Sequence, residues 1–553
     1  MLLTRLLGCT LALLTSLTAA QNVTTVPIYD PLTATITSTH ALLYTYEITC
    51  ASVISSHLSL IASLNPTINA ITALSPTSLA RAAEIDTLLS SPDFVPGPLT
   101  CIPVLLKDSF DSPPLATTAG SLALADLYPA APAPVVRALT DAGAIVVGKA
   151  NMHELALEGI TVSSLGGQTR NPFALDRTPG GSSGGTAAAL AAGFAVLGTG
   201  SDTVNSLRSP ASANGLVSVR ATRGLISRSG VIGVSFTQDV VGPMARCVTD
   251  VAIMLGVMAG VGLDAGDNAT ALVPEGLRGT DYAKGLDEGQ LEGLRIGVLE
   301  GFFDRTGRGE TEDVNRAMDS MIEDLKEAGV KIVRIQEEVY DANAILKKYD
   351  VQKYEFREAV EDYLQRPDLK GDFPKTLKEV YDRDDFVVIP PQYEHIKTAL
   401  RSSTSNESYL SAMQDITDLK QTLHDTFTSN KLDAIIYPQQ KNLVVKIGTP
   451  SQHGRNGILA AVTGSPVVAV PAGFSASNDD EDGVPIGMEI LGQPWTEAKL
   501  LQIAYQIERY VQRRTPKIAR EVVPEDSFIE VPRITPNKNN IHTAYPRGVL
   551  NGS

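Results

Sequence analysis

Apolar and polar positions in the first third of the chain predict alternating helices and strands. Apolar residues recur every three to four positions over 40–65 and 76–92, which predicts two amphipathic helices. A mostly apolar run over 99–110 predicts a buried strand that ends in charged residues. Residues 144–148 predict a second strand, directly after a helix that stops at Gly143.

The middle of the chain continues this alternation with a higher content of small residues. Residues 160–183 are rich in Gly, Asn, Pro and Ser, which is typical of a loop region. An alanine-rich helix is predicted over 184–197, and its small side chains imply close packing. The pattern then favours a strand over 223–233 and a helix over 248–260.

The second half departs from this pattern and then returns to it. Between about 310 and 430 the chain is rich in charged residues with apolar positions at helical spacing, which predicts amphipathic helices. Strand-like runs return at 432–437, 464–474 and 485–492. We expect these strands to join the early ones in one α/β domain with helices on both faces of the sheet. The domain spans 21–525, and 526–553 is an extended tail.

The N-terminus has the pattern of a secretory signal peptide. Arg5 precedes an apolar segment over 6–17, and small residues at 18–20 offer a cleavage site. The alternative is an uncleaved membrane anchor, but the apolar segment is shorter than the ~18 residues that a span needs. We therefore predict that 1–20 is removed, that the protein is secreted, and that it has no membrane span.

Secretion affects the cysteines and the glycosylation sequons. The chain has four cysteines, and Cys9 would leave with the signal. The remaining three allow one disulfide and one free thiol. Secretion also makes N-glycosylation possible at four sequons, which begin at Asn22, Asn268, Asn406 and Asn551.

Composition and motif spacing exclude several classes of function. The net charge is −16 without a dense basic run, which argues against nucleic-acid binding. Gly143 to Lys149 has the spacing of a phosphate-binding loop, but Ala150 replaces the required Ser or Thr. The seven histidines are scattered, and His153-Glu154 lacks the second histidine of a zinc protease motif. We predict no metal and no cofactor.

The run from Gly180 to Gly184 fits the pattern G-x-S-x-G of a nucleophile elbow, centred on Ser182. Downstream histidines that could complete a triad with an aspartate are His395, His424, His453 and His542. However, the run follows a loop, whereas an elbow follows a buried strand. It could instead be a helix N-terminus that Ser183 or a neighbour caps. The motif alone leaves an elbow, a cap and a third role open.

Several segments, in this order, resemble the amidase signature family. They include "GAIVVGKANMHE", "TPGGSSGGTAAALAAG", "GSDTVNSLRSP", "TQDVVGPMAR" and "GSPVVAVPAGF". The resemblance covers nearly the whole mature chain and is least distinctive over about 310–430. It implies a mixed sheet covered by helices on both faces.

The resemblance also implies a Ser–Ser–Lys catalytic set. Lys107 would be the base, Ser182 the proton relay on a cis peptide bond, and Ser206 the nucleophile. A serine hydroxyl needs a base to remove its proton, and burial favours the neutral form of a lysine. Backbone N–H groups of residues 203–206 would stabilise the oxyanion. These four residues are Thr203, Val204, Asn205 and Ser206.

Other residues of this region are given supporting roles. The resemblance implies that Asp202 and Arg208 hold the nucleophile loop, the alternative being an ion pair at the surface, and Ser183 is a further supporting residue. Ser201 and Ser209 are assigned no chemistry.

The chain departs from the family pattern just before the nucleophile. Most members of the family have two glycines where this chain has Val204 and Asn205. The backbone N–H donors persist, but the two side chains would narrow the approach to Ser206 or bias the choice of substrate. Because Val204 is β-branched, we predict that its φ is negative.

The resemblance also favours a disulfide between Cys50 and Cys101. It places the helix that carries Cys50 near the strand that carries the lysine.

These features together predict a secreted amidase that hydrolyses a small-molecule carboxamide through an acyl-Ser206 intermediate. One alternative is acyl transfer to an amine from the same intermediate. A second is a Ser-His-Asp esterase built on Ser182. A third is a catalytically silent binding protein with this fold. The sequence does not predict the identity of the amide or the oligomeric state.

Overall fold

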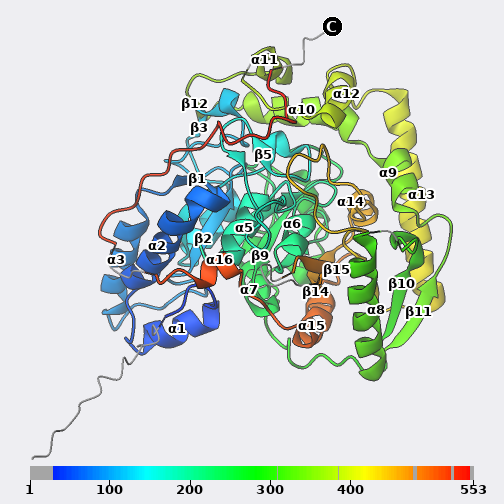
Figure 1. Cartoon of the computed structure of the whole chain (residues 1–553), viewed down its shortest axis with the longest axis horizontal. Coiled ribbons are helices and arrows are strands. Elements are labelled where there is room, and N and C mark those ends of the chain that lie inside the picture. Colours follow the sequence, from blue (N-terminus) through cyan, green and yellow to red (C-terminus); the bar gives the residue numbers. More distant parts are fainter. Residues whose placement is uncertain (1–28, 308, 384, 477–482, 525–527, 549–553) are drawn as a thin grey trace, which may run out of the picture.

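The structure, a computed structural model, describes residues 29–548 except 308, 384, 477–482 and 525–527 (Figure 1). Over these residues its centre is a mixed sheet of eleven strands. In spatial order the strands are β1 (Ile71–Leu74), β4 (Ile145–Ala150), β2 (Pro103–Lys107), β7 (Leu197–Asp202), β9 (Val240–Ala245), β8 (Val217–Arg220), β14 (Val467–Phe474), β15 (Pro485–Leu491), β13 (Ala434–Pro438), β10 (Arg295–Leu299) and β11 (Lys331–Ile335).

The sheet joins distant parts of the sequence. Strand β2 runs parallel to both of its neighbours, β4 and β7, whereas β9, β8, β14 and β15 are joined by antiparallel pairing. The late strands β13, β14 and β15 lie in the same sheet as the early ones, which confirms that prediction. Strand β2 is buried along its whole length. A strand that is buried on both faces needs an uninterrupted apolar run, and this one ends at a single lysine.

Two groups of helices flank this sheet. Helix α7 contacts both α4 and α15, and α7 and α15 pack on β8, β9 and β14. Helices α5 and α6 contact each other and pack on β2, β7, β8 and β15. The helices are α1 (Ile36–Tyr44), α2 (Cys50–Ile68), α3 (Ser78–Leu89), α4 (Pro134–Asp141), α5 (Gly184–Ala191), α6 (Arg208–Ala213), α7 (Val248–Ala259), α8 (Thr311–Glu327), α9 (Ala342–Tyr349), α10 (Gln352–Leu364), α11 (Leu377–Asp382), α12 (Pro390–Ala399), α13 (Glu407–Asn430), α14 (Ile458–Thr463), α15 (Glu497–Ile507) and α16 (Lys517–Arg520).

The predicted helix over 40–65 is two helices, α1 and α2. The chain breaks between them, with Tyr46 in the left-handed region at φ 59°. Thr49 begins α2 because its side chain accepts a hydrogen bond from the backbone of Ser52, and Asp86 accepts two more from the backbone at the same end. These hydrogen bonds favour the start of a second helix after Thr49 over one continuous helix. The helix predicted over 76–92 is α3.

Two predictions in the middle of the chain need correction. The helix predicted over 184–197 ends at Ala191, because the chain turns at Gly193 with φ +77°. No strand forms over 223–233, where the described backbone makes only an isolated bridge from Val231 to Phe110. The strands of this region are β8 and β9 on either side, so Leu225, Ile226 and Ile232 are buried in a loop.

The stretch over about 310–430 is mainly helical, as predicted, but it also contributes strands. Strand β11 is the last strand at one edge of the sheet, where it pairs in parallel with β10. Two small sheets lie outside the main one: β3 (Tyr128–Pro129) pairs with β12 (Leu369–Lys370), and β5 (Val162–Ser163) pairs with β6 (Gly167–Gln168). In Figure 1, α10, α11 and α12 gather at the upper edge of the molecule.

The C-terminal segment over 528–548 is extended and lies against the body of the protein. Its Asn540 carbonyl accepts a hydrogen bond of 2.7 Å from the backbone of Gln168. The Tyr545 ring is buried, and its hydroxyl accepts from Gly448 N and donates to the Thr449 carbonyl. The predicted tail is therefore packed along the surface rather than projecting from it.

The features predicted from the first residues lie outside the described part of the chain. These are the signal peptide over 1–20 and the sequon at Asn22, and the sequon at Asn551 lies outside it as well. The sequon residues Asn268 and Asn406 are both exposed. Within the described residues, no helix has both the length and the apolar character that crossing a membrane requires.

Candidate active site

Lys107 is the last residue of β2 and is fully buried. Its Nζ donates hydrogen bonds to Ser182 Oγ at 2.7 Å and to Ser201 Oγ at 2.8 Å. Burial lowers the pKa of Lys107 to about 7, although Asp202 and Asp239 act in the opposite direction. A substantial share of this lysine is therefore neutral near pH 7 and able to accept a proton.

Ser182 lies in the glycine-rich loop that leads into α5. The Gly181–Ser182 peptide bond is cis, and the Ser182 side chain is buried. The Ser182 carbonyl accepts a hydrogen bond of 3.0 Å from His153 N. The first turn of α5 passes so close to its surroundings that a Cβ at Gly185 would lie 2.1 Å from the Asn151 carbonyl oxygen. The glycines of this motif therefore permit close backbone packing around Ser182.

Ser183 is the N-cap residue of α5, but its side chain makes no capping hydrogen bond. Its Oγ instead donates to the Ser201 carbonyl at 3.3 Å, and its backbone N donates to the Ser206 carbonyl at 3.1 Å. The run is therefore a helix N-terminus, as one interpretation of the motif had it, but the Ser183 side chain does not cap the helix. The second bond places the segments that carry Ser182 and Ser206 side by side.

Ser206 lies in the loop between β7 and α6. Within the described residues, the backbone N–H groups of residues 203–206 donate no hydrogen bond to another part of the protein. All four residues line a common cavity. The φ angle of Val204 is negative, as predicted. Four N–H groups without partners beside one hydroxyl are the donors that an oxyanion requires.

A buried charge network holds this loop. The Asp202 carboxylate accepts hydrogen bonds from Leu207 N, Arg208 Nε and Arg220 Nη1 at 3.1, 3.1 and 2.8 Å. Arg208 also bonds Glu489, and its guanidinium donates to the Val204 carbonyl within the loop. All four charged side chains are fully buried, so the alternative of a surface ion pair is wrong.

The network also fixes the charge of its central carboxylate. Burial alone would raise the pKa of Asp202, but Arg208 and Arg220 outweigh it and hold that pKa well below its usual range. Asp202 is therefore ionised at every physiological pH.

Ser201 belongs to the site although the sequence assigned it no chemistry. Its hydroxyl is the second partner of Lys107 Nζ, opposite Ser182. Ser201 lies on β7, five residues before Ser206 in the sequence. Neither the apolar pattern nor the motif distinguishes it from an ordinary strand residue. The parallel pairing of β2 with β7 brings it to the lysine, and that pairing was not predicted.

The histidines do not support a Ser-His-Asp site on Ser182. The side-chain hydrogen bond of Ser182 comes from Lys107, and no described histidine ring bonds to its hydroxyl. His424 bonds Gln493 on an exposed surface, and His542 caps the backbone at Ala544. Among the described residues, no group of three or more His, Cys, Asp or Glu is arranged to hold a metal.

The run from Gly143 to Lys149 leads into a β-strand and is not a phosphate-binding loop. Residues 145–150 form β4, and Lys149 is buried with its Nζ 3.1 Å from Asp108 Oδ1.

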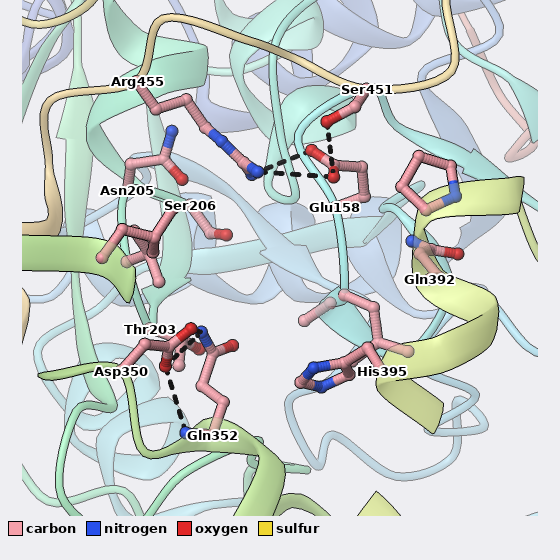
Figure 2. Close-up of a pocket in the computed structure, with 15 residues that line it drawn as sticks. Glu158, Thr203, Asn205, Ser206, Asp350, Gln352, Gln392, His395, Ser451 and Arg455 are labelled. Atoms are coloured by element: carbon pink, nitrogen blue, oxygen red, sulfur yellow. Dashed lines mark hydrogen bonds and ion pairs between the residues drawn. The ribbon is translucent and has the colours of Figure 1, made fainter. Parts of the chain in front are cut away.

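A cavity of about 240 Å³ opens beside Ser206 (Figure 2). One wall is the loop over 203–206. A second carries Glu158, whose carboxylate pairs with Arg455 at 2.8 Å and accepts from Ser451 Oγ at 2.9 Å. The remaining wall comes from the helical stretch over about 310–430, with Leu346, Asp350, Gln352, Gln392 and His395.

Cys50 and Cys101, the predicted pair, form a disulfide with a Cα–Cα distance of 5.6 Å. It ties the start of α2 to the residues just before β2. Cys247 is a buried free thiol.

Comparison with known proteins identifies the family. The family model described as Amidase matches residues 52–501. A glutamyl-tRNA(Gln) amidotransferase subunit from Alkaliphilus metalliredigens (strain QYMF) is 33% identical over 485 residues, which are 84% of this chain and 93% of the relative.

Solved structures agree with this match. The peptide amidase from Stenotrophomonas maltophilia has a TM-score of 0.77 and 32% identity, and the match covers 88% of this chain and 99% of that one. The corresponding glutamyl-tRNA(Gln) amidotransferase subunit from Thermotoga maritima has a TM-score of 0.69 and 26% identity, with coverage of 88% and 98%. The chain therefore belongs to the amidase signature family of enzymes.

Proposed function

We propose that the protein is an amidase that hydrolyses a carboxamide through an acyl-enzyme on Ser206. The observation that carries the proposal is the hydrogen bond of 2.7 Å between the buried Lys107 amine and the Ser182 hydroxyl. Next to this bond is the loop over 203–206, whose N–H groups donate no hydrogen bond to another part of the described chain and whose four residues line one cavity. The two parts supply the base and the oxyanion site that attack on an amide requires.

In the first half-reaction, Ser206 Oγ attacks the amide carbonyl carbon while its proton passes through Ser182 to neutral Lys107. The resulting oxyanion accepts hydrogen bonds from the N–H groups of residues 203–206. The same relay returns the proton to the amide nitrogen, the C–N bond breaks, and ammonia or an amine leaves. In the second half-reaction, water gives a proton to the relay and attacks the acyl-Ser206 ester. The bond between the acyl carbon and Ser206 Oγ then breaks, the relay returns the proton to Ser206 Oγ, and the carboxylic acid leaves.

The contact between Lys107 and Ser201 orients the amine in both protonation states. A neutral amine has two N–H donors and one lone pair. It can therefore donate to Ser201 while its lone pair accepts the proton from Ser182. The distance of 2.8 Å to Ser201 fits this arrangement.

The decisive experiment measures acylation by intact mass with a panel of amides and esters. We expect a covalent adduct on the wild type and none on Ser206→Ala. A covalent adduct on Ser206→Ala would overturn the assignment of the nucleophile. Lys107→Ala separates this proposal from a Ser-His-Asp site on Ser182, because it should abolish acylation here and leave that alternative almost unaffected. Failure of a fluorophosphonate probe to label the wild type would favour a silent binding protein.

A second candidate is acyl transfer to an amine, which the amidotransferase names of the relatives favour. Both reactions share the acyl-enzyme and differ only in the acceptor. Product analysis with an added amine distinguishes them, since transfer yields a new amide without free acid.

We also propose that the protein is secreted and that residues 1–20 are its signal peptide. The charge and apolar pattern of these residues supports this, as does the disulfide, since disulfides persist in oxidising compartments. N-terminal sequencing of protein recovered from culture medium tests it, and a mature chain that begins at Met1 would contradict it.

A further inference from the structure

The cavity beside Ser206 carries an uneven set of charges. Its lining includes two carboxylates, Glu158 and Asp350, and one guanidinium, Arg455. Because the acyl group is bonded to Ser206 in the proposed acyl-enzyme, a cavity lined by Ser206 is placed to receive the acyl part of the substrate.

The charge of Glu158 is already neutralised. Arg455 Nη1 lies 2.8 Å from one carboxylate oxygen, and Arg455 Nη2 lies 3.4 Å from the other. Ser451 donates a further hydrogen bond of 2.9 Å to the same carboxylate. Figure 2 shows this group on the wall opposite Asp350. Since both oxygens of the Glu158 carboxylate are hydrogen-bonded to Arg455, the pair has little net charge with which to bind a charged ligand.

Asp350 has no such partner. Within the described part of the chain, its carboxylate accepts hydrogen bonds only from Gln352, through the backbone N at 3.1 Å and through Nε2 at 3.0 Å. Among the described residues, no Lys, Arg or His side chain lies within ion-pair distance of it. Figure 2 shows Asp350 and Gln352 together, away from Glu158 and Arg455. One negative charge in the cavity therefore remains unpaired.

His395 does not supply the missing positive charge. It lines the cavity, but burial lowers its pKa, so the ring is neutral near pH 7. Its Nε2 is buried and has no hydrogen-bond partner among the described residues. The cavity therefore offers a carboxylate and an uncharged imidazole, and no free cation among the residues described around it.

We propose that the preferred substrate is a small amide whose acyl chain carries an ammonium or similar cationic group, bound by Asp350. The volume of about 240 Å³ suits a short chain and not a large one. A carboxylate on the acyl chain would instead meet the unpaired charge of Asp350. This inference rests on the proposed amidase function.

Three matched series of primary amides test the inference: ω-amino amides, unbranched alkanamides and ω-carboxy amides, each with two to six carbons. On the wild type we expect kcat/KM to be highest for an ω-amino amide, exceeding the alkanamide of equal length by about tenfold or more. The ω-carboxy amides should be the poorest. Added salt should reduce the preference, because it screens the attraction between charges.

Asp350→Asn removes the charge and keeps the shape of the side chain. We expect the ratio of kcat/KM between amino amide and alkanamide to fall toward one. Asp415→Asn is the matched control, since Asp415 pairs with Lys348 outside the cavity and its loss changes the net charge equally. The control should keep the wild-type ratio. An unchanged ratio in Asp350→Asn, or a wild-type preference for carboxy amides, would overturn the inference.

A binding measurement separates this inference from the proposed function. Calorimetry on Ser206→Ala compares the Kd of an ω-amino amide with that of the equal-length alkanamide, with and without Asp350→Asn. If the amino amide binds more tightly than the alkanamide and Asp350→Asn removes this difference, the result supports the inference even if no amide is turned over. In that case only the proposed hydrolysis would be wrong. Equal Kd values overturn the inference even if hydrolysis is observed.

Discussion

Lys107 Nζ lies 2.7 Å from Ser182 Oγ, and both side chains are closed off from solvent. Only the neutral amine can accept a proton, and burial brings the pKa of Lys107 to about 7. We therefore expect the acylation rate to rise as the pH passes about 7 and to level off above that value. Single-turnover acylation from about pH 5 to about pH 9 measures this. Lys107→Arg, which stays protonated, should be inactive throughout, and a flat wild-type profile would contradict the role of the lysine.

The same burial should appear in the stability of the fold. The folded-state pKa of about 7 lies below the model-peptide value of 10.5, so between these values the unfolded chain binds more protons. The contribution of Lys107 to the free energy of unfolding therefore rises with pH over this interval. We expect the difference between wild type and Lys107→Met, measured by denaturant unfolding, to change in favour of the wild type from about pH 7 to about pH 10. A difference that is independent of pH would contradict this.

Asp202 joins two buried arginines and the nucleophile loop, so its charge should matter more than that of any surface carboxylate. Asp202→Asn removes a negative charge that balances the buried positive charges of Arg208 and Arg220. We expect it to lower the free energy of unfolding by about 3–5 kcal/mol. Asp382→Asn breaks the exposed pair with Lys378 and should cost less than about 1 kcal/mol. Denaturant unfolding of both variants makes the comparison. Equal losses would show that the network is not the main support of the loop.

The disulfide between Cys50 and Cys101 closes a loop with a sequence separation of 51 residues. Because it restricts the unfolded chain, we expect the double variant Cys50→Ala/Cys101→Ala to lose about 2–4 kcal/mol of unfolding free energy. Thermal unfolding and denaturant titration measure the loss. Reducing agent should destabilise the wild type but not the double variant. If alkylation without reductant labels both thiols, the bond is absent.

Much of the fold could be predicted because its strands are short apolar runs between helical patterns. Strands β2, β14 and β15 each fall within a predicted run, and β4 and β13 overlap theirs but extend one or two residues further. The apolar pattern could not show where Thr49 and Asp86 cap a new helix, since those contacts are polar. It also could not show that Leu225, Ile226 and Ile232 are buried in a loop, because burial leaves the same apolar pattern in a strand and in a packed loop.

The candidate site could be predicted from ordered motifs, which name Lys107, Ser182 and Ser206. Ser201 could not be predicted, because its contact with Lys107 depends on which strands are neighbours in the sheet. The far wall of the cavity was also out of reach. Asp350 and Gln352 come from the helical stretch, where the sequence shows only amphipathic helices with solvated faces and no motif. The sequence names His395 only as a possible triad partner of Ser182, which is a different role.

Asn205 is where the chain departs from the glycine of its family, and it lines the cavity beside Ser206. Its amide nitrogen is buried without a hydrogen-bond partner among the described residues, so no contact of that nitrogen anchors the side chain. We expect Asn205→Gly to keep the acylation step, since the backbone N–H donors remain, and to enlarge the space beside the nucleophile. The variant should then gain on branched acyl chains relative to short linear ones, by about tenfold in the ratio of kcat/KM.

Val204→Gly is the matched comparison, because it removes the neighbouring side chain, which packs on an apolar cluster. Steady-state kinetics on branched and linear amides measures both. Loss of acylation in Asn205→Gly, with the fold intact by circular dichroism, would show that the Asn205 side chain is needed for acylation and does not merely narrow the cavity.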